Sequence, residues 1–395
     1  MRTHAFAVLA VSVAASIGSA QTQPNPLFTP PEGDPFASPF YTAPSTRTLP
    51  NGVEVPPAAP EALLGPGKAL LRERFWLSSD FFIAVGSRTV LPALAVTSPV
   101  GTNPVLGQPG AVTLFGGDQL SGVRPGLRAD AGMWIGDRLG VDGSFLFVAT
   151  ERVTFNAATE PGGPALVRPI RTVAGESAVP LGQSGPDSLT ATAATWTIGG
   201  DVNVRWNLRR SEFVTCDLFA GYRYLHLWDQ VRVSNTLTDA GTPLARTTLT
   251  DEFRTINQFH GPQVGLATSA RLFDRLTFTT RLGVALGATV TDARLSGGSS
   301  IGGVTTPSGL LVRGTNAGRY EGTEFAVLPT ADAKFGYDLT DCFRLSVGYS
   351  FLYWSRVERA GDQIDRTLSF NRPVYPARGT DYWLQGLTLG AEVRY

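Results

Sequence analysis

DYWLQGLTLGAEVRY, residues 381–395, is the stretch that decides the fold. Most of its apolar residues fall on one parity, and charged or small residues alternate with them over its second half. The apolar parity carries Trp383, Leu387, Leu389, Ala391, Val393 and Tyr395, and the other carries Gly386, Thr388, Gly390, Glu392 and Arg394. Because successive side chains of a β-strand point to opposite faces, this alternation predicts a strand with one apolar face. An edge strand of a soluble sheet and a strand of a membrane barrel both have this pattern.

The end of the stretch favours the membrane interpretation. An amphipathic strand that finishes on an aromatic residue resembles the signal by which bacterial outer-membrane barrels are recognised for insertion. Such an assembly signal would consist of Leu387, Leu389, Val393 and Tyr395. The partners that it implies are outer-membrane lipid and the barrel-assembly machinery.

The composition excludes several classes of protein. Charged residues make up 17% of the 395 residues, compared with roughly 25% in a typical soluble domain. The formal net charge is zero, so the chain has no basic field that would attract nucleic acid. Beyond the N-terminus, no apolar run reaches the roughly 18 residues that a transmembrane helix needs. Two cysteines, Cys216 and Cys342, are too few for a disulfide scaffold or a zinc site, and we expect no bond between them.

The N-terminal region predicts export. Arg2 and His4 precede an apolar run, which small residues at 18–20 follow. This pattern is typical of a secretory signal peptide cut after Ala20. Residues 21–73 are rich in proline, which removes backbone donors and favours extended chain, so we expect a disordered periplasmic lead-in there. Residues 74–395 form the third predicted region.

In this third region, amphipathic strands are joined by short turns and long loops in strict alternation. We expect about ten strands, joined by four tight turns and five longer connections. The predicted strands are 74–86, 124–135, 139–150, 194–208, 213–233, 251–272, 276–290, 325–339, 343–357 and 381–395. The first alternates poorly, and two further segments, 89–97 and 111–115, have strand character. If these two segments are strands, the number rises to about twelve and the closing strand has a different partner.

The strand lengths favour a membrane barrel over a soluble sandwich. Soluble strands typically have about five or six residues, whereas most of these are at least twice as long. Bacterial membrane barrels have even strand numbers, short periplasmic turns and long outer loops, and closure pairs every backbone group within lipid. We therefore predict an all-β fold, a single closed antiparallel transmembrane β-barrel of about ten strands, in the range of eight to twelve. The last predicted strand, 381–395, should close the sheet against the first, 74–86.

Charged residues on the polar parity would face the lumen, because an arginine or lysine in mid-bilayer costs about 2–4 kcal/mol. These candidate lumen-facing residues are Arg128, Asp130, Asp142, Asp201, Arg205, Asp217, Arg223, Arg281, Asp332, Lys334, Arg344 and Arg356. A paired, hydrated network that fills a narrow barrel is the expected role, and a selectivity filter is the alternative. Aromatic residues near strand ends suggest interfacial girdles, namely Trp134, Trp196, Trp206, Trp228, Tyr353, Trp354 and Trp383.

Four sequence motifs carry a resemblance to a known family. They are FWLSSDFF (75–82), LFGGDQL (114–120), SGVRPGLRADAGMWIGDRLGVDGSFLFV (121–148) and SFNRPV (369–374). In this order they resemble the putative beta-barrel porin seven family of planctomycete-type bacteria, over about residues 74–395. The resemblance implies an outer-membrane location and a barrel architecture. It supplies no catalytic residues.

Catalytic and cofactor chemistry is sparsely represented. His226 and His260 are the histidines that remain after the predicted signal peptide, and neither belongs to a recognisable catalytic arrangement. We expect no enzyme activity, no cofactor and no metal site. The leading hypothesis is porin-like passage of small solutes through a narrow polar lumen. The alternatives are a non-conducting structural or surface-display barrel whose outer loops bind partners, and a secreted soluble β-protein.

Overall fold

The computed structural model describes residues 47–48, 54–55, 74–182, 186–238 and 246–395. The predicted signal peptide (1–20) and almost all of the predicted lead-in (21–73) lie outside the described residues. The chain divides into two compact units, Met1–Gly65 and Pro66–Tyr395. In the first unit, β1 (Arg47–Thr48) pairs antiparallel with β2 (Glu54–Val55).

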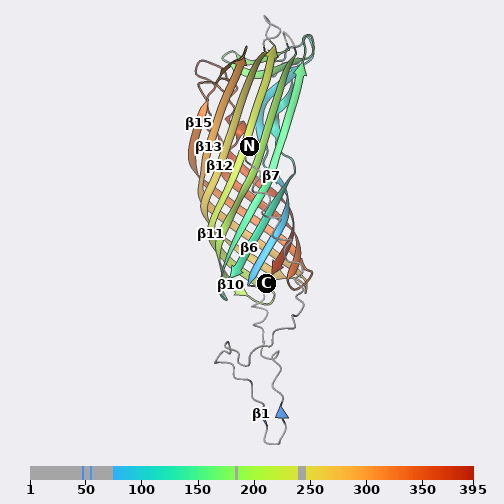
Figure 1. Cartoon of the computed structure of the whole chain (residues 1–395), viewed down its shortest axis with the longest axis vertical. Helices are drawn as coiled ribbons and strands as arrows, with labels where there is room; N and C mark the ends of the chain where they lie inside the picture. The colour runs from blue at the N-terminus through green and yellow to red at the C-terminus, as the bar shows by residue number, and fades with distance from the viewer. Residues whose placement is uncertain (1–46, 49–53, 56–73, 183–185, 239–245) are drawn as a thin grey trace, which may run out of the picture. The chain divides into compact units, whose positions relative to one another are not determined.

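The second unit contains a β-barrel with a wall of ten strands (Figure 1). Each wall strand pairs antiparallel with both neighbours, and the pairing of β12 with β13 closes the ring. In order around the wall, the strands are β12 (Arg246–Arg271), β11 (Val214–Thr238), β10 (Asp187–Arg210), β7 (Leu139–Thr159), β6 (Arg124–Trp134), β3 (Phe75–Gly86), β17 (Gly379–Arg394), β16 (Phe343–Glu358), β15 (Gly318–Asp338) and β13 (Leu276–Ile301). The predicted all-β fold class, a closed antiparallel barrel, is confirmed.

The first and last wall strands are neighbours, as their sequences predict. β3 and β17 pair antiparallel from Trp76 opposite Arg394 to Gly86 opposite Leu384. Phe75 and Tyr395 extend the pairing by exchanging two backbone hydrogen bonds of 2.8 and 2.9 Å. The poor alternation of β3 arises because its inward face carries the apolar residues Phe82 and Ala84 beside Asp80.

The wall has two different ends. Tight turns at 135–138, 211–213, 272–275 and 339–342 lie at one end, which we call the turn end. The longer connections lie at the other, which we call the loop end. The predicted alternation of turns and loops is therefore observed.

Part of the chain at the loop end forms a second sheet, separate from the wall. This four-stranded loop sheet has the order β5 (Val112–Gln119), β4 (Thr89–Ser98), β8 (Ala165–Thr172), β9 (Gly175–Leu181). The segments 89–97 and 111–115 are thus strands, but they pair with each other and with β8 instead of joining the wall. The wall consequently has ten strands and not twelve.

Several wall strands are longer than the sequence pattern predicts. β12 and β13 each have 26 residues, whereas about 9–11 cross a bilayer. Residues 151–159 and 295–301, which we expected to be loop, continue β7 and β13. Towards the loop end the outward residues are mostly polar or small, so the apolar alternation fades although the backbone pairing continues.

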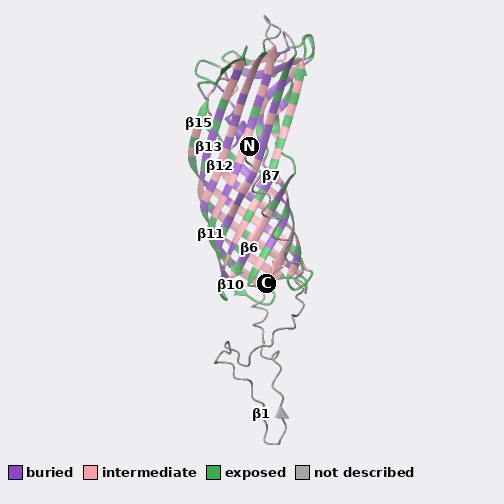
Figure 2. Cartoon of the chain, viewed as in Figure 1, coloured by how far each residue is buried: buried purple, intermediate pink, exposed green. Residues whose placement is uncertain are grey.

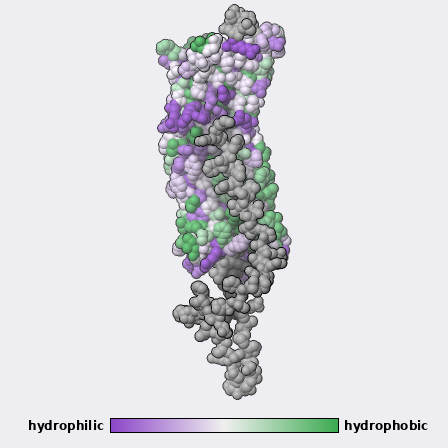
Figure 3. Space-filling view, viewed as in Figure 1, coloured by the Kyte–Doolittle hydropathy of each residue, from purple (hydrophilic) through white to green (hydrophobic). Residues whose placement is uncertain are grey.

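Burial is inverted relative to a soluble protein over the part of the wall near the turn end. The outward side chains there are large, apolar and exposed, including Phe81, Leu127, Val202, Leu282 and Leu387. Figure 2 shows buried and exposed residues alternating along the strands, and Figure 3 shows a hydrophilic band above a more hydrophobic lower surface. Among the described residues, no helix is long and apolar enough to cross a membrane.

Candidate functional site

The barrel lumen is the candidate site, because the chemically active side chains gather there. Eleven of the twelve predicted lumen residues are buried or half-buried, all except Arg356. The alternation of β10 illustrates the cause: Asp201, Asn203 and Asn207 are buried, whereas Val202 and Val204 between them are exposed. The polar parity therefore faces inward at these positions.

One group of lumen charges centres on two aspartates. Asp142 of β7 accepts contacts from Arg205 at 2.8 Å and from Arg281 at 3.0 Å. Asp201 of β10 pairs with Arg223 at 2.7 Å and with Arg281 at 3.4 Å. Because β13, which carries Arg281, is not a neighbour of β7 or β10, its guanidinium bridges across the lumen.

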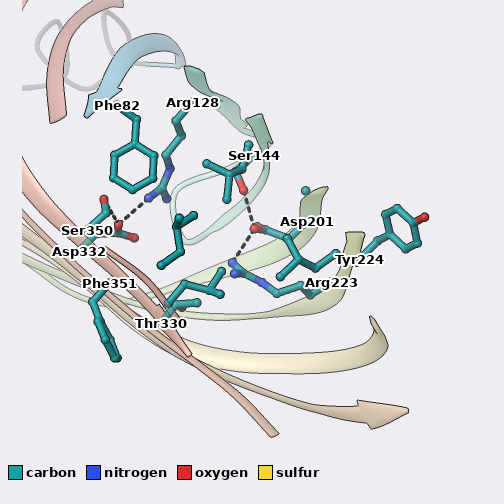
Figure 4. A pocket seen from close by; sticks show the side chains of 15 residues that line it. Phe82, Arg128, Ser144, Asp201, Arg223, Tyr224, Thr330, Asp332, Ser350 and Phe351 are labelled. Carbon is teal, nitrogen blue, oxygen red and sulfur yellow. Dashed lines mark hydrogen bonds and ion pairs between the residues drawn. The ribbon is translucent and has the colours of Figure 1, made fainter. Parts of the chain in front are cut away.

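A second group lines the same pocket as Asp201 and Arg223 of the first (Figure 4). Arg128 of β6 pairs with Asp332 of β15, and three strands separate these two around the wall. Asp332 also accepts a hydrogen bond of 2.6 Å from Ser350. Lys334 pairs with Asp80. Of the remaining predicted residues, Asp217 contacts Arg205, Asp130 contacts Arg128, and Arg344 binds Asp338.

Arg356 does not face the lumen, which corrects the prediction for this residue. It is exposed, and its φ of +60° lies in the left-handed region. The pairing of β16 with β17 shifts register between Trp354 and Val357, which is a β-bulge. A bulge adds one residue to a strand and thereby inverts the parity beyond it.

Several further residues belong to this network although the sequence pattern did not predict them. Asp80 is 1% exposed, and Asn203 and Gln263 are buried among the lumen charges. Gln263 accepts a hydrogen bond of 2.8 Å from Arg223, and Asn203 donates one of 2.7 Å to Asp142. Inward parity is the signal that identifies Asn203 and Gln263, which are uncharged, whereas the poor alternation of β3 conceals Asp80.

A small cavity lies among these charges. It has a volume of about 50 Å³, and its lining includes Arg128, Asp201, Arg223, Asp332 and Ser350. Since one water needs about 10–15 Å³ of such space, the cavity has room for a few waters and no larger solute.

An apolar layer crosses the lumen on the loop-end side of the charges. This inner apolar layer consists of Phe82, Ala84, Val148, Leu225, Leu227, Phe259, Ala285, Ala326, Leu328, Leu352, Trp354, Val357, Tyr382 and Leu384. β11 shows the order along one strand: Arg223 in the charged network precedes Leu225 and Leu227.

Trp354 lies at the centre of this layer and not in an interfacial girdle, which corrects its predicted place. Its side chain is 0% exposed, and its ring makes edge contacts with Phe259 at 6.1 Å and Tyr382 at 6.5 Å between centroids. Its indole Nε1 donates a hydrogen bond of 2.8 Å to Thr289. A buried indole with a satisfied donor is a stable element of a packed core.

Beyond this layer, the loop sheet and two connections fill the loop-end half of the lumen. We call this filling the plug. Its core joins Leu94, Phe115 and Leu166 of the loop sheet to inward wall residues such as Leu189 and Val233. Leu310, Leu311 and Val312, from the connection between β14 (Val304–Thr306) and β15, pack in the same core, as does Ile364 after the 3-10 turn η2 (Ala360–Gln363).

Two buried arginines fasten the plug to the wall. Arg168 of β8 pairs with Asp251 of β12 at 2.7 Å, and the two side chains are 1% and 0% exposed. The other carboxylate oxygen of Asp251 accepts the backbone N–H groups of Leu311 and Val312, at 2.9 and 2.8 Å. Arg359 similarly pairs with Asp229 of β11 and donates to Ser87 and Thr89.

The histidines and cysteines form no reactive arrangement with one another in the described part of the chain. His226 and His260 lie on the outer surface, where His226 stacks on Trp196 at 4.9 Å and Tyr222 approaches the Nδ1 of His260 at 3.1 Å. Cys216 and Cys342 are free thiols. Across residues 74–182, 186–238 and 246–395, no group of three His, Cys, Asp or Glu residues could hold a metal ion.

Comparison with known proteins gives a family and weak structural likenesses. The family model described as "Putative beta barrel porin-7" matches residues 76–395. The outer membrane protease OmpT from Escherichia coli is similar at a TM-score of 0.42 and 10% identity, covering 82% of this chain and 97% of that one. The toluene transporter TodX of P. putida is similar at a TM-score of 0.21 and 7% identity, covering 83% of this chain and 91% of that one. At these scores the solved structures carry no functional inference. No curated protein matches.

Proposed function

The chain belongs to the putative beta barrel porin-7 family and is an outer-membrane β-barrel, and from this premise we propose that it is a non-conducting structural and surface-display barrel. In this proposal the wall anchors the protein in the outer membrane. The plug closes the lumen and holds the outer loops in a fixed arrangement. The turn end is then periplasmic and the loop end is outside the cell.

The inner apolar layer is the observation that carries the proposal. Leu227, Leu328 and Trp354 are each 0% exposed within it, so their contacts fill the lumen at that level. An ion that passed there would lose most of its hydration among side chains that are mainly apolar, which costs several kcal/mol or more. Below the layer, the cavity between the paired charges has space for a few waters.

Conductance in planar bilayers tests this proposal directly. Full-length protein, checked for folding on a heat-modifiability gel, should give no stable current steps in strong salt. Liposome swelling with small sugars should likewise match that of protein-free vesicles. Reproducible steps that scale with salt concentration would contradict a closed barrel and support the alternative.

Porin-like passage of small solutes is that alternative. The observation in its favour is the polar network near the turn end, with its small cavity between Arg128, Asp201 and Asp332. Passage would require both the plug and the inner apolar layer to move. If such movement occurs, the double variant Arg168→Met with Arg359→Met, which lacks the two plug arginines, should conduct more than the wild type. If the layer stays packed, neither the variant nor the wild type should conduct.

A further inference from the structure

Three arginines lie side by side on the outer surface of neighbouring wall strands. Arg254 of β12 is directly opposite Arg294 of β13, and Arg294 is directly opposite Arg319 of β15. Directly opposed residues have Cβ atoms about 4.5–5.5 Å apart, and like charges in such pairs destabilise a sheet. A row of three guanidinium groups therefore needs anions nearby.

The protein supplies only part of this compensation. Asp292 binds Arg294 at 3.2 Å and Arg319 at 3.0 Å, and Glu321 binds Arg319 at 2.6 Å. Both carboxylates thus serve the β13–β15 side of the row. They offset two of the three positive charges.

Arg254 is the member that these carboxylates do not satisfy. Its Nε is buried and has no hydrogen-bond partner among the described residues. Glu252, the acid nearest to it in sequence, instead accepts a hydrogen bond of 2.9 Å from Gln230. The guanidinium beside Arg294 therefore lacks an anion that the fold could have placed there.

The position of the row relative to the bilayer indicates the source of such an anion. β12 runs from the loop end towards the turn end, so Ile256, Gln258 and His260 lie successively closer to the membrane than Arg254. Ile256 is opposite Trp228, which is opposite Trp196, and these tryptophans stack with ring centroids 6.5 Å apart. Outward tryptophan and tyrosine residues mark the interface of a bilayer, and two residues of strand correspond to about 7 Å. The row thus lies at or just outside the level of the outer headgroups.

Below the row, the wall offers an apolar surface. Val290 of β13 is 38% exposed, Leu286 is 48% exposed and Phe325 of β15 is 67% exposed. An acyl chain could lie against these side chains while its headgroup reached the arginines.

We propose that Arg254, Arg294 and Arg319 form a binding site for the phosphate of a phosphorylated outer-leaflet lipid. A guanidinium presents a planar fork of N–H donors that matches phosphate oxygens in a bidentate manner. The phosphate lies between Arg254 and Arg294 and provides the missing negative charge. Asp292 acts as a positioning residue, because it holds Arg294 and Arg319 without reaching Arg254 in an ion pair.

Native mass spectrometry of the full chain in neutral detergent tests this site. The probes are diphosphorylated lipid A, phosphatidylcholine as a zwitterionic lipid, and inorganic phosphate. The variant is Arg254→Gln with Arg294→Gln, and the matched control is Arg271→Gln, an exposed arginine at the opposite end of β12. A heat-modifiability gel verifies that each variant is folded, and Arg254→Lys provides a second variant that retains the charge.

The wild type and the Arg271→Gln control should retain lipid A equally, and both should retain it in preference to phosphatidylcholine. Each arginine removed should weaken lipid A binding about fivefold, so the double variant should bind roughly twenty- to thirtyfold less tightly. The affinity of Arg254→Lys for lipid A should fall between that of the wild type and that of the double variant. Undiminished lipid A binding by the double variant overturns the proposal, as does equal retention of phosphatidylcholine. Inorganic phosphate that displaces lipid A at equal concentration also overturns it, because the site would then recognise a free anion and not a lipid.

Discussion

At the scale of single residues, the buried ion pairs of the plug contribute more to stability than the exposed ion pairs do. Asp251 is 0% exposed and joins three segments: its own strand, Arg168 of β8 and the backbone at Leu311 and Val312. A carboxylate that satisfies a buried guanidinium and two N–H groups leaves all of them unpaired when it is removed. The residue is therefore an attachment point of the plug.

Replacing Asp251 with alanine should destabilise the protein by about 3–5 kcal/mol, because Arg168 would remain as an uncompensated buried charge. Urea unfolding in detergent micelles measures this loss. The matched control is Asp118→Ala, which removes an exposed pair with Arg88 and should cost at most about 1 kcal/mol. Equal losses of unfolding free energy in the two variants would show that the buried pair stabilises the protein no more than the exposed pair does.

Glu358 gives the plug a dependence on pH. It lies at the loop end of β16, and burial raises the pKa of its carboxyl above the ordinary value of 4.5. Its partner is the hydroxyl of Tyr375, which stacks on Tyr320 at 4.0 Å. The folded chain holds the proton to a higher pH than the unfolded chain, so stability in this region is lost as pH rises above about 4.5.

After correction for the intrinsic exchange rates, hydrogen exchange of residues 359–378 should therefore be faster at pH 8 than at pH 5. In Glu358→Gln the group no longer titrates, and this difference should shrink. Asp365 acts in the opposite sense. Burial would raise the pKa of its carboxyl, but backbone hydrogen bonds from Thr367 and Val374 outweigh burial and lower the pKa. The contribution of Asp365 to stability is therefore lost only as the pH falls under more acidic conditions. An unchanged pH dependence in Glu358→Gln would remove Glu358 as the cause.

At the scale of elements, the seam between β3 and β17 joins the first strand of the wall to the last. Leu387 and Leu389 of β17 are 54% and 51% exposed and face outward, whereas Thr388 between them is 1% exposed. At the turn end, Tyr395 pairs with Phe75 through backbone hydrogen bonds. The predicted assembly-signal residues thus lie on the outward face of a seam strand or at its end.

Deletion of Val393 to Tyr395 should abolish outer-membrane assembly while export continues. The deletion removes the pairing of Val393 with both Leu77 and Phe343, and it leaves two strand ends unpaired. Membrane fractionation with a heat-modifiability gel measures assembly, and Tyr395→Phe is the control that retains the aromatic ring. Normal insertion of the truncated chain would refute the assembly role of these residues.

The success and failure of sequence prediction also follow from the elements. Alternation identified the wall strands wherever one face is apolar, and it placed most inward charges because parity is preserved along a regular strand. It failed at Arg356, where the bulge after Trp354 inverts the parity. It also could not foresee the loop sheet, since β4 pairs with β8 about seventy residues away, at Val96 opposite Val167. Strand character is local, whereas the choice of partner depends on the whole packed plug.

At the scale of the whole molecule, the barrel has two tiers. Near the turn end its interior is polar and its exterior apolar; near the loop end an apolar core fills the lumen and the exterior is polar. The inner apolar layer joins the tiers, so its packing should control the stability of the entire wall.

Trp354→Ala should lower the temperature at which the folded band converts to the unfolded band on a heat-modifiability gel. Removing a buried tryptophan typically costs about 3–5 kcal/mol, because it leaves a cavity. Trp383→Ala is the control, since Trp383 belongs to the half-buried outer surface of β17 and should change the conversion less. An equal shift in the two variants would mean that the layer is not the junction we describe.

The length of the wall also determines how far the barrel extends beyond the bilayer. A strand of 26 residues, at about 3.4 Å per residue and a tilt of about 40°, rises about 65 Å. The apolar band of an outer-membrane barrel accounts for about 25 Å of this, which leaves roughly 40 Å beyond it. Val173 and Phe370, which are 93% and 96% exposed, lie in the loops at that end. In the orientation proposed above, such loops stand clear of the headgroup sugars, within reach of an antibody, a phage or a neighbouring cell.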